Sequence, residues 1–119
     1  MDQEKTYTID YDEDYLEFIR RVIAEQPDHE PLRIVEQLVE IALGELKGRP
    51  CDISAAVSEE RMKVTIRHNG KQIDGRMIRV LGDFTDRVDY HPDGDNDHWV
   101  LTIRRDVPPP FVTRHHNEY

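Results

Sequence analysis

The sequence has a single cysteine and no long apolar run. Because Cys51 has no partner in the 119 residues, no disulfide can form within the chain, and nothing indicates an oxidising compartment. No apolar stretch approaches the roughly 18 to 20 residues of a membrane-spanning helix, and the first residues lack the pattern of a signal peptide. We therefore expect a cytoplasmic protein.

Positive charge is also scarce. Sixteen Lys and Arg residues stand against 25 Asp and Glu, which gives a formal net charge of −9. Attraction to phosphate backbones comes from clustered Lys and Arg, and Arg104 with Arg105 makes no such patch. We therefore do not expect nucleic acid as a partner.

The first half of the chain predicts one strand and two helices. Apolar and polar residues alternate over residues 6–11, the two-residue period of a strand buried on one face. The acidic run 12–14 precedes an apolar stripe of helical spacing, and this helix should end near Pro27. A second helix is predicted with Pro31 in its first turn and with Gly48 beyond its end.

The second half predicts two hairpins around a third helix. Alternation over residues 53–57 and 62–68 predicts the first hairpin, and residues 88–90 and 99–103 predict the second. Asp74 is well placed to cap the helix between them. The apolar stripe of that helix consists of Met77, Leu81, Phe84, Thr85 and Val88.

These elements predict an α+β domain over residues 1–107. Three amphipathic helices on one face of a mixed, mainly antiparallel five-stranded sheet would bury every apolar stripe, so we expect a two-layer sandwich. Residues 108–119 begin with three prolines, which end regular structure, and we assign them to a Pro-rich C-terminal tail.

Three segments carry a resemblance to a known family. Residues 36–42 read Glu-Gln-Leu-Val-Glu-Ile-Ala, residues 64–73 form an apolar strand that runs into His-Asn-Gly, and residues 77–90 hold the last helix and the start of the closing hairpin. Over about residues 5–105 the chain resembles the ATP-binding domain of the histidine-kinase-like (GHKL) ATPases, most closely the anti-sigma-factor serine kinases. Those kinases have Glu-Ala-Val-x-Asn-Ala and Asp-x-Gly-x-Gly at the first two places.

The resemblance implies a nucleotide site in which several positions depart from the family. Glu40 or Ile41 stands where the family has the Asn that holds Mg²⁺ through oxygen. His68 replaces the Asp that binds adenine, and its alternation with Ile66 predicts that its side chain points inward and fills the pocket. Gln72 replaces a Gly that lets the backbone approach the ligand.

The segment that follows leaves no room for the family's ATP lid. If Asp74 caps the third helix, its carboxylate also occupies the place of a phosphate and repels it. We therefore predict that nucleotide binding is lost, with no catalytic residue and no cofactor. The vestigial nucleotide-binding positions are Glu40, His68, Asn69 and Gly70.

The favoured hypothesis is a non-catalytic regulatory module that binds a protein. The resemblance implies a sigma factor, an anti-sigma antagonist or a second copy of the chain as partner. Candidate partner-binding aromatic residues, which could equally belong to the core, are Tyr7, Tyr11, Tyr15 and Phe18. Two alternatives stay open: an active MgATP-dependent serine kinase with an atypical site that uses Glu40, His68 and Asn69, and a stand-alone protein without a partner.

Two polar segments have some metal-binding character. The acidic residues of 93–97 have the spacing of a Ca²⁺ loop, but His98 and Arg104 stand where that loop needs Gly and Glu. His115 and His116 are expected to chelate only loosely in a terminal tail. We therefore expect no metal site.

Overall fold

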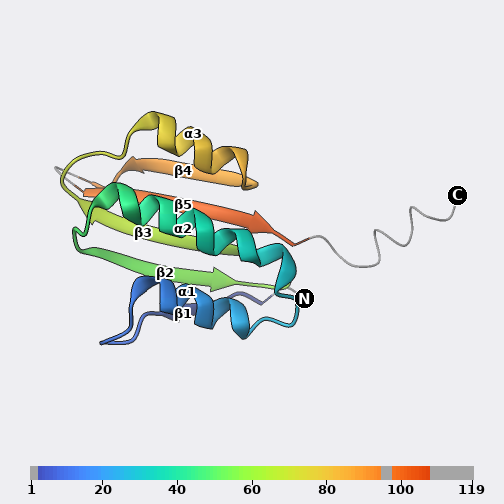
Figure 1. Ribbon diagram of the computed structural model, residues 1–119. Helices are drawn as coiled ribbons and strands as arrows, with labels where there is room; N and C mark the ends of the chain where they lie inside the picture. Colours follow the sequence, from blue (N-terminus) through green and yellow to red (C-terminus); the bar gives the residue numbers. More distant parts are fainter. Residues whose placement is uncertain (1–2, 95–97, 108–119) are drawn as a thin grey trace, which may run out of the picture.

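The computed structural model describes residues 3–94 and 98–107, which form five strands and three α-helices (Figure 1). The elements are, in chain order, β1 (Lys5–Thr8), α1 (Tyr15–Ala24), α2 (Arg33–Leu46), β2 (Cys51–Val57), β3 (Arg61–Asn69), α3 (Gly75–Asp83), β4 (Arg87–Pro92) and β5 (His98–Asp106). A short 3-10 helix, η1 (Glu30–Leu32), leads directly into α2. The predicted α+β class and the predicted order of helices and strands are confirmed.

The strands form one open sheet in the order β1-β2-β3-β5-β4. Every pairing between neighbouring strands is antiparallel, so the expectation of a mixed sheet is wrong for the described strands. The helix α3 does return the chain so that β4 runs parallel to β3. However, β5 lies between these two strands and is antiparallel to both.

One face of the sheet is buried. Alternate residues of the central strands point into the core, as the two-residue period predicted. The buried residues of α1 and α2 belong to the same core cluster, and Figure 1 shows these helices lying across one side of the sheet while α3 runs beside β4. The buried strand residues are Ile53, Ala55, Val57, Met62, Val64, Ile66, His68, Leu101 and Ile103.

The helix α3 is shorter than its apolar stripe predicted. It ends at Asp83, and the Thr85 hydroxyl donates a hydrogen bond of 2.9 Å to the Leu81 carbonyl in its last turn. Val88, which the sequence placed both in this stripe and in the second hairpin, lies in β4, where it pairs with Ile103. The apolar residues beyond Asp83 continue the helical spacing by coincidence. Phe84, the first of them, is 57% exposed at the end of the helix.

The first strand is also shorter than predicted. Alternation over residues 6–11 suggested one strand, but β1 ends at Thr8 because the chain then turns, with the Glu13 amide donating to the Asp10 carbonyl over 3.1 Å. This turn leaves Tyr11 fully exposed.

Several predictions fall on residues outside the described ranges. These are the tail at 108–119 with its two histidines, and the middle of the acidic segment at 95–97. In the described part of the chain, none of the helices has the length and apolar character needed to cross a bilayer.

Candidate functional site at the end of strand β3

The C-terminal end of β3 holds a histidine that is buried in the core. His68 continues the inward alternation of β3 and is only 2% exposed. A buried polar side chain must find hydrogen-bond partners, because an unsatisfied group costs about 1 to 3 kcal/mol. His68 finds two, one on each ring nitrogen.

The two ring nitrogens of His68 have different hydrogen-bond partners. Its Nδ1 lies 3.2 Å from the Asn69 carbonyl, which can only accept, so Nδ1 carries the proton. Its Nε2 lies 2.9 Å from the Tyr90 hydroxyl, and this hydroxyl also accepts a bond of 2.8 Å from the Ile73 amide. The hydrogen bonds thus form a series that links the Ile73 amide, the Tyr90 hydroxyl and Nε2 of His68.

Tyr90 joins this chain to a stack of rings. The His68 and Tyr90 rings are 5.9 Å apart and nearly parallel, and the Tyr90 and Trp99 rings are 5.1 Å apart. Burial raises the pKa of the Tyr90 phenol, so the hydroxyl stays protonated and can donate to His68. Three side chains from three strands therefore pack together on the inner face of the sheet at the end of β3.

Asn69 and Gly70 follow His68 and have structural tasks of their own. Asn69 is exposed and pairs with His98 of β5. Gly70 has φ +89°, a backbone conformation that favours glycine. A Cβ at this position would also lie 2.7 Å from Nη1 of Arg49. The glycine therefore allows Arg49 to cross this turn.

Arg49 connects the end of α2 to the segment between β3 and α3. Its Nε donates to the Leu46 carbonyl over 2.9 Å, and its Nη2 donates to the Lys71 carbonyl over 3.3 Å. One side chain thus holds together two connections that are far apart in sequence.

The structure does not bring Glu40 to the other three candidate positions. Glu40 is exposed on α2, while its neighbours Val39 and Ala42 face the core. It lines neither of two larger surface hollows, of about 510 and 540 Å³, near the end of β3. His68, Asn69 and Gly70 lie together because they are consecutive.

Residues 70–74 make the whole connection from β3 to α3. As predicted, Asp74 caps the helix: its Oδ1 accepts a hydrogen bond of 2.9 Å from the Arg76 amide. This bond, aided by the Arg76 side chain, holds the pKa of Asp74 below its usual range. Gln72 is exposed, and Ile73 beside it is buried.

The four candidate aromatic residues of the first strand and helix lie in different environments. Phe18 is fully buried in the core. The Tyr15 hydroxyl exchanges hydrogen bonds of 3.1 and 3.2 Å with the backbone of Cys51, and the Tyr7 hydroxyl accepts one of 3.3 Å from Gln26. Tyr11 is the only one of the four that is fully exposed.

The hollow of about 510 Å³ opens beside His68 and contains the single cysteine. Burial raises the pKa of the Cys51 thiol, which disfavours the nucleophilic thiolate. Over residues 3–94 and 98–107, His, Cys, Asp and Glu side chains nowhere gather in a group of three that could hold a metal ion.

Sequence reasoning missed Tyr90, Trp99 and Arg49. The inward alternation of the closing hairpin could have indicated that Tyr90 and Trp99 share the face of His68, because a pairing register brings them to the same end of the sheet. No local pattern singles out Arg49, which lies between Gly48 and Pro50. No protein-family model matches this chain, and the comparison with curated proteins finds no match either.

Proposed function

We propose that this protein is a non-catalytic regulatory module that binds another protein. Under this proposal the domain is a two-layer sandwich related to the anti-sigma-factor serine kinases of the GHKL type, and it has lost ATP binding. The observation that carries the proposal is the buried His68, with its hydrogen bonds to Tyr90 and Asn69. This ring occupies the place where the family's adenine-binding Asp would stand.

The connection between β3 and α3 supports the same conclusion. Residues 70–74 are too few for a lid that folds over a nucleotide, and the Asp74 side chain already caps the N-terminus of α3, where a phosphate would bind. Glu40, the remaining candidate Mg²⁺ ligand, lies on the exposed side of α2. A triphosphate would meet the packed His68 and Tyr90 rings at one end, and at the other it would find the Arg76 amide already bonded to Asp74.

The proposed partner is a cytoplasmic protein of the same regulatory system, a sigma factor or an anti-sigma antagonist, or a second copy of this chain. The fully exposed Tyr11 next to β1 is the accessible member of the candidate aromatic set. Aromatic side chains in such positions are common anchors of protein interfaces.

Thermal unfolding with and without MgATP tests the loss of the nucleotide. A ligand at a hundred times its dissociation constant stabilises by about 2.7 kcal/mol, a melting shift on the order of ten degrees for a domain of this size. We expect no shift beyond that of magnesium triphosphate at equal ionic strength. A larger shift with MgATP that Asn69→Ala and Glu40→Ala abolish would support the atypical kinase instead.

Light scattering and affinity capture test the binding of a protein. The full chain at micromolar concentration is expected to elute as a dimer or to retain one protein in stoichiometric amount from its native extract. Tyr11→Ala, which removes an exposed ring without touching the core, is the matched variant and should weaken that complex. A monomer that retains no protein would contradict the proposal and favour a stand-alone role.

A further inference from the structure

The negative charge of the molecule is concentrated in one stretch. Residues 10–46, which include α1 and α2, hold eleven Asp or Glu residues against three Arg. The remaining sequence holds fourteen acidic and thirteen basic residues, so it is close to neutral. An acidic partner would be repelled from the two helices and could approach only elsewhere.

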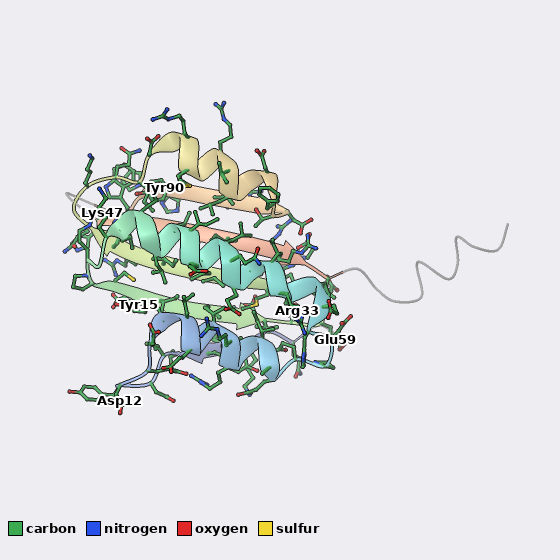
Figure 2. All side chains as sticks on the ribbon, viewed as in Figure 1. Asp12, Tyr15, Arg33, Lys47, Glu59 and Tyr90 are labelled. Carbon is green, nitrogen blue, oxygen red and sulfur yellow. The ribbon has the colours of Figure 1, made fainter. Side chains whose placement is uncertain are left out.

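The hollow of about 540 Å³ lies between the end of α2 and the connection from β3 to α3. Figure 2 shows Lys47 at this end of α2, on the same side of the molecule as Tyr90. Besides Gln72 and Ile73, its lining consists of the basic residues Lys47, Arg49 and Lys71 and the acidic residues Glu45 and Asp74.

Unlike most basic residues in the described part of the chain, those of this hollow form no ion pair with an acidic residue there. The described part of the chain contains fifteen Lys and Arg residues, and ten of them form ion pairs there. Of the five that form none in the described ranges, three line this hollow. The other two, Lys5 and Arg79, lie on β1 and α3.

The two carboxylates of the lining offset this charge only in part. Asp74 accepts from the Arg76 amide and forms an ion pair of 3.3 Å with the Arg76 side chain, which lies outside the lining. Its charge is therefore already balanced. Glu45 alone remains to oppose three cations.

The three basic side chains of the hollow are also arranged in a way that favours anion binding. Arg49 is fixed by its bonds to the Leu46 and Lys71 carbonyls, so little of its conformational freedom is left to lose on binding. Lys47 and Lys71 are exposed, and their flexible ammonium groups can reach toward a bound group. Charge-assisted hydrogen bonds from such donors to an oxyanion are about twice as strong as neutral ones.

We propose that this hollow is a recognition site for an oxyanion on a protein partner, the carboxylate or phosphate of an acidic segment. The inference rests on the proposed function, since it names the chemistry of the partner. It also explains how a chain with a net charge of −9 can accept an acidic protein, at the end of α2 where three basic residues line one hollow.

The test is a titration of the full-length ¹⁵N-labelled protein with a synthetic peptide of alternating Ser and Glu. A phosphoserine version and a neutral Ser-Gln version are titrated in parallel, as are inorganic phosphate and MgATP. We expect the acidic peptides to shift the amide signals of residues 45–49 and 70–74, and the neutral peptide to leave them in place. Phosphate should shift the same signals with at least about tenfold weaker affinity, because it lacks the neighbouring acidic groups.

Paired charge reversals locate the site. Lys47→Glu with Lys71→Glu should weaken peptide binding by about tenfold or more. Lys5→Glu with Arg79→Glu reverses two cations that also form no ion pair in the described ranges, and it should change binding less than about threefold. Circular dichroism of both double variants verifies that they fold. If the Lys47→Glu with Lys71→Glu variant does not fold, Lys47→Gln with Lys71→Gln replaces it.

The outcomes separate the two proposals. No acidic peptide binding, or equal weakening by both double variants, would overturn the oxyanion site and leave the regulatory module standing, because a partner could bind elsewhere. Phosphate as tight as the peptides would identify a free-anion site and overturn the inference. MgATP that binds at these residues more tightly than the peptides would overturn both.

Discussion

At the scale of single residues, His68 shows how a buried polar side chain can have a structural task. Its side chain is buried, both ring nitrogens are bonded, and its ring stacks on Tyr90. None of these contacts needs a ligand. The imidazole therefore contributes to stability directly, and this contribution can be measured.

We expect His68→Ala to lower the free energy of unfolding by about 2 to 4 kcal/mol, because it leaves a cavity and removes the acceptor of the Tyr90 hydroxyl. Urea denaturation monitored by circular dichroism gives this value. The exposed His91, whose Nδ1 lies 3.0 Å from the Pro92 carbonyl, provides the matched control, and His91→Ala should cost less than about 0.5 kcal/mol. Equal losses in the two variants would contradict a packed role for His68.

Gly70 carries a second prediction at this scale. Gly70→Ala should destabilise by about 1 to 3 kcal/mol, because φ is +89° and the new Cβ would push against Arg49. Gly44→Ala is the matched control: its Cβ would meet nothing within 4 Å inside α2, so it should be neutral or stabilise by up to about 1 kcal/mol. Thermal melts of both variants decide the sign, and a stable Gly70→Ala would show that this turn is not constrained.

At the scale of elements, one ion pair connects β1 to α1. Two nitrogens of Arg21 lie 2.9 Å from the two carboxylate oxygens of Glu13, and Nη2 also donates to the Thr8 carbonyl over 3.1 Å. The side chain of Arg21 and the Asp10 amide hold the pKa of Glu13 below its usual range. A bidentate pair of this kind orients the turn that leads from the edge strand into the helix.

The lowered pKa of Glu13 predicts a pH dependence. A carboxyl group with a lower pKa in the folded than in the unfolded protein stabilises above its unfolded pKa and loses this contribution as the pH falls through the folded pKa. Glu13→Gln should therefore lower the urea midpoint at pH 7 and lose most of this effect near pH 3. Glu59→Gln, an exposed residue in the turn between β2 and β3, should show no such pH-dependent difference. A constant gap between Glu13→Gln and the unmodified chain would contradict the ion pair.

The elements also show where sequence reasoning succeeds. The helix α2 and the β2–β3 hairpin were predicted nearly to their ends, because a wide apolar stripe and a strict alternation admit one interpretation each. The end of α3 was predicted wrongly because Phe84 and Val88 happen to extend its spacing. The sequence placed Val88 both in this stripe and in the second hairpin, and its pairing with Ile103 confirms the hairpin.

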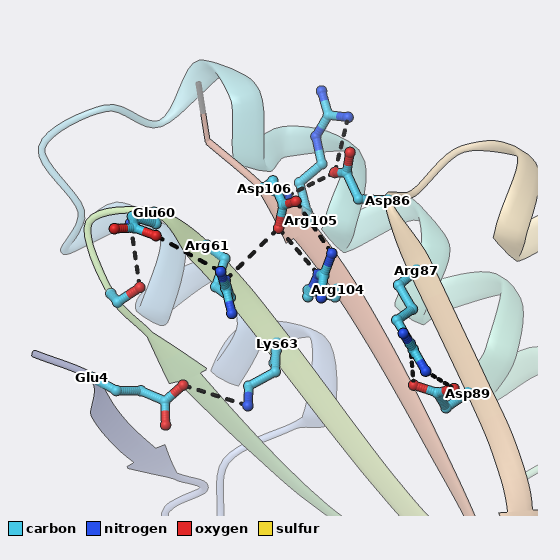
Figure 3. A network of polar contacts seen from close by, with 11 residues as sticks. Glu4, Glu60, Arg61, Lys63, Asp86, Arg87, Asp89, Arg104, Arg105 and Asp106 are labelled. Atoms are coloured by element: carbon cyan, nitrogen blue, oxygen red, sulfur yellow. Dashed lines mark hydrogen bonds and ion pairs between the residues drawn. The ribbon is translucent and has the colours of Figure 1, made fainter. Parts of the chain in front are cut away.

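At the scale of the whole molecule, the two faces of the sheet are stabilised by different physics. The inner face is apolar, whereas the outer face of β3, β4 and β5 carries ion pairs such as Arg104 with Asp106 at 3.1 Å and Arg87 with Asp89 at 2.9 Å (Figure 3). Exposed pairs of this kind contribute little stability. They do keep the uncovered face and its edge strand charged, which disfavours association through the sheet edge.

The sequence by itself determined the α+β class, the order of the elements, the inward direction of His68 and the cap at Asp74, because these depend on periodicity and on contacts within a few residues. The tertiary structure decided what surrounds His68, since Tyr90 and Trp99 reach it only through the register of three paired strands. It also decided that Lys47, Arg49 and Lys71 line one hollow, because that requires the end of α2 to meet the connection after β3. Long-range pairing leaves no local pattern, so these arrangements could be recognised only in the folded chain.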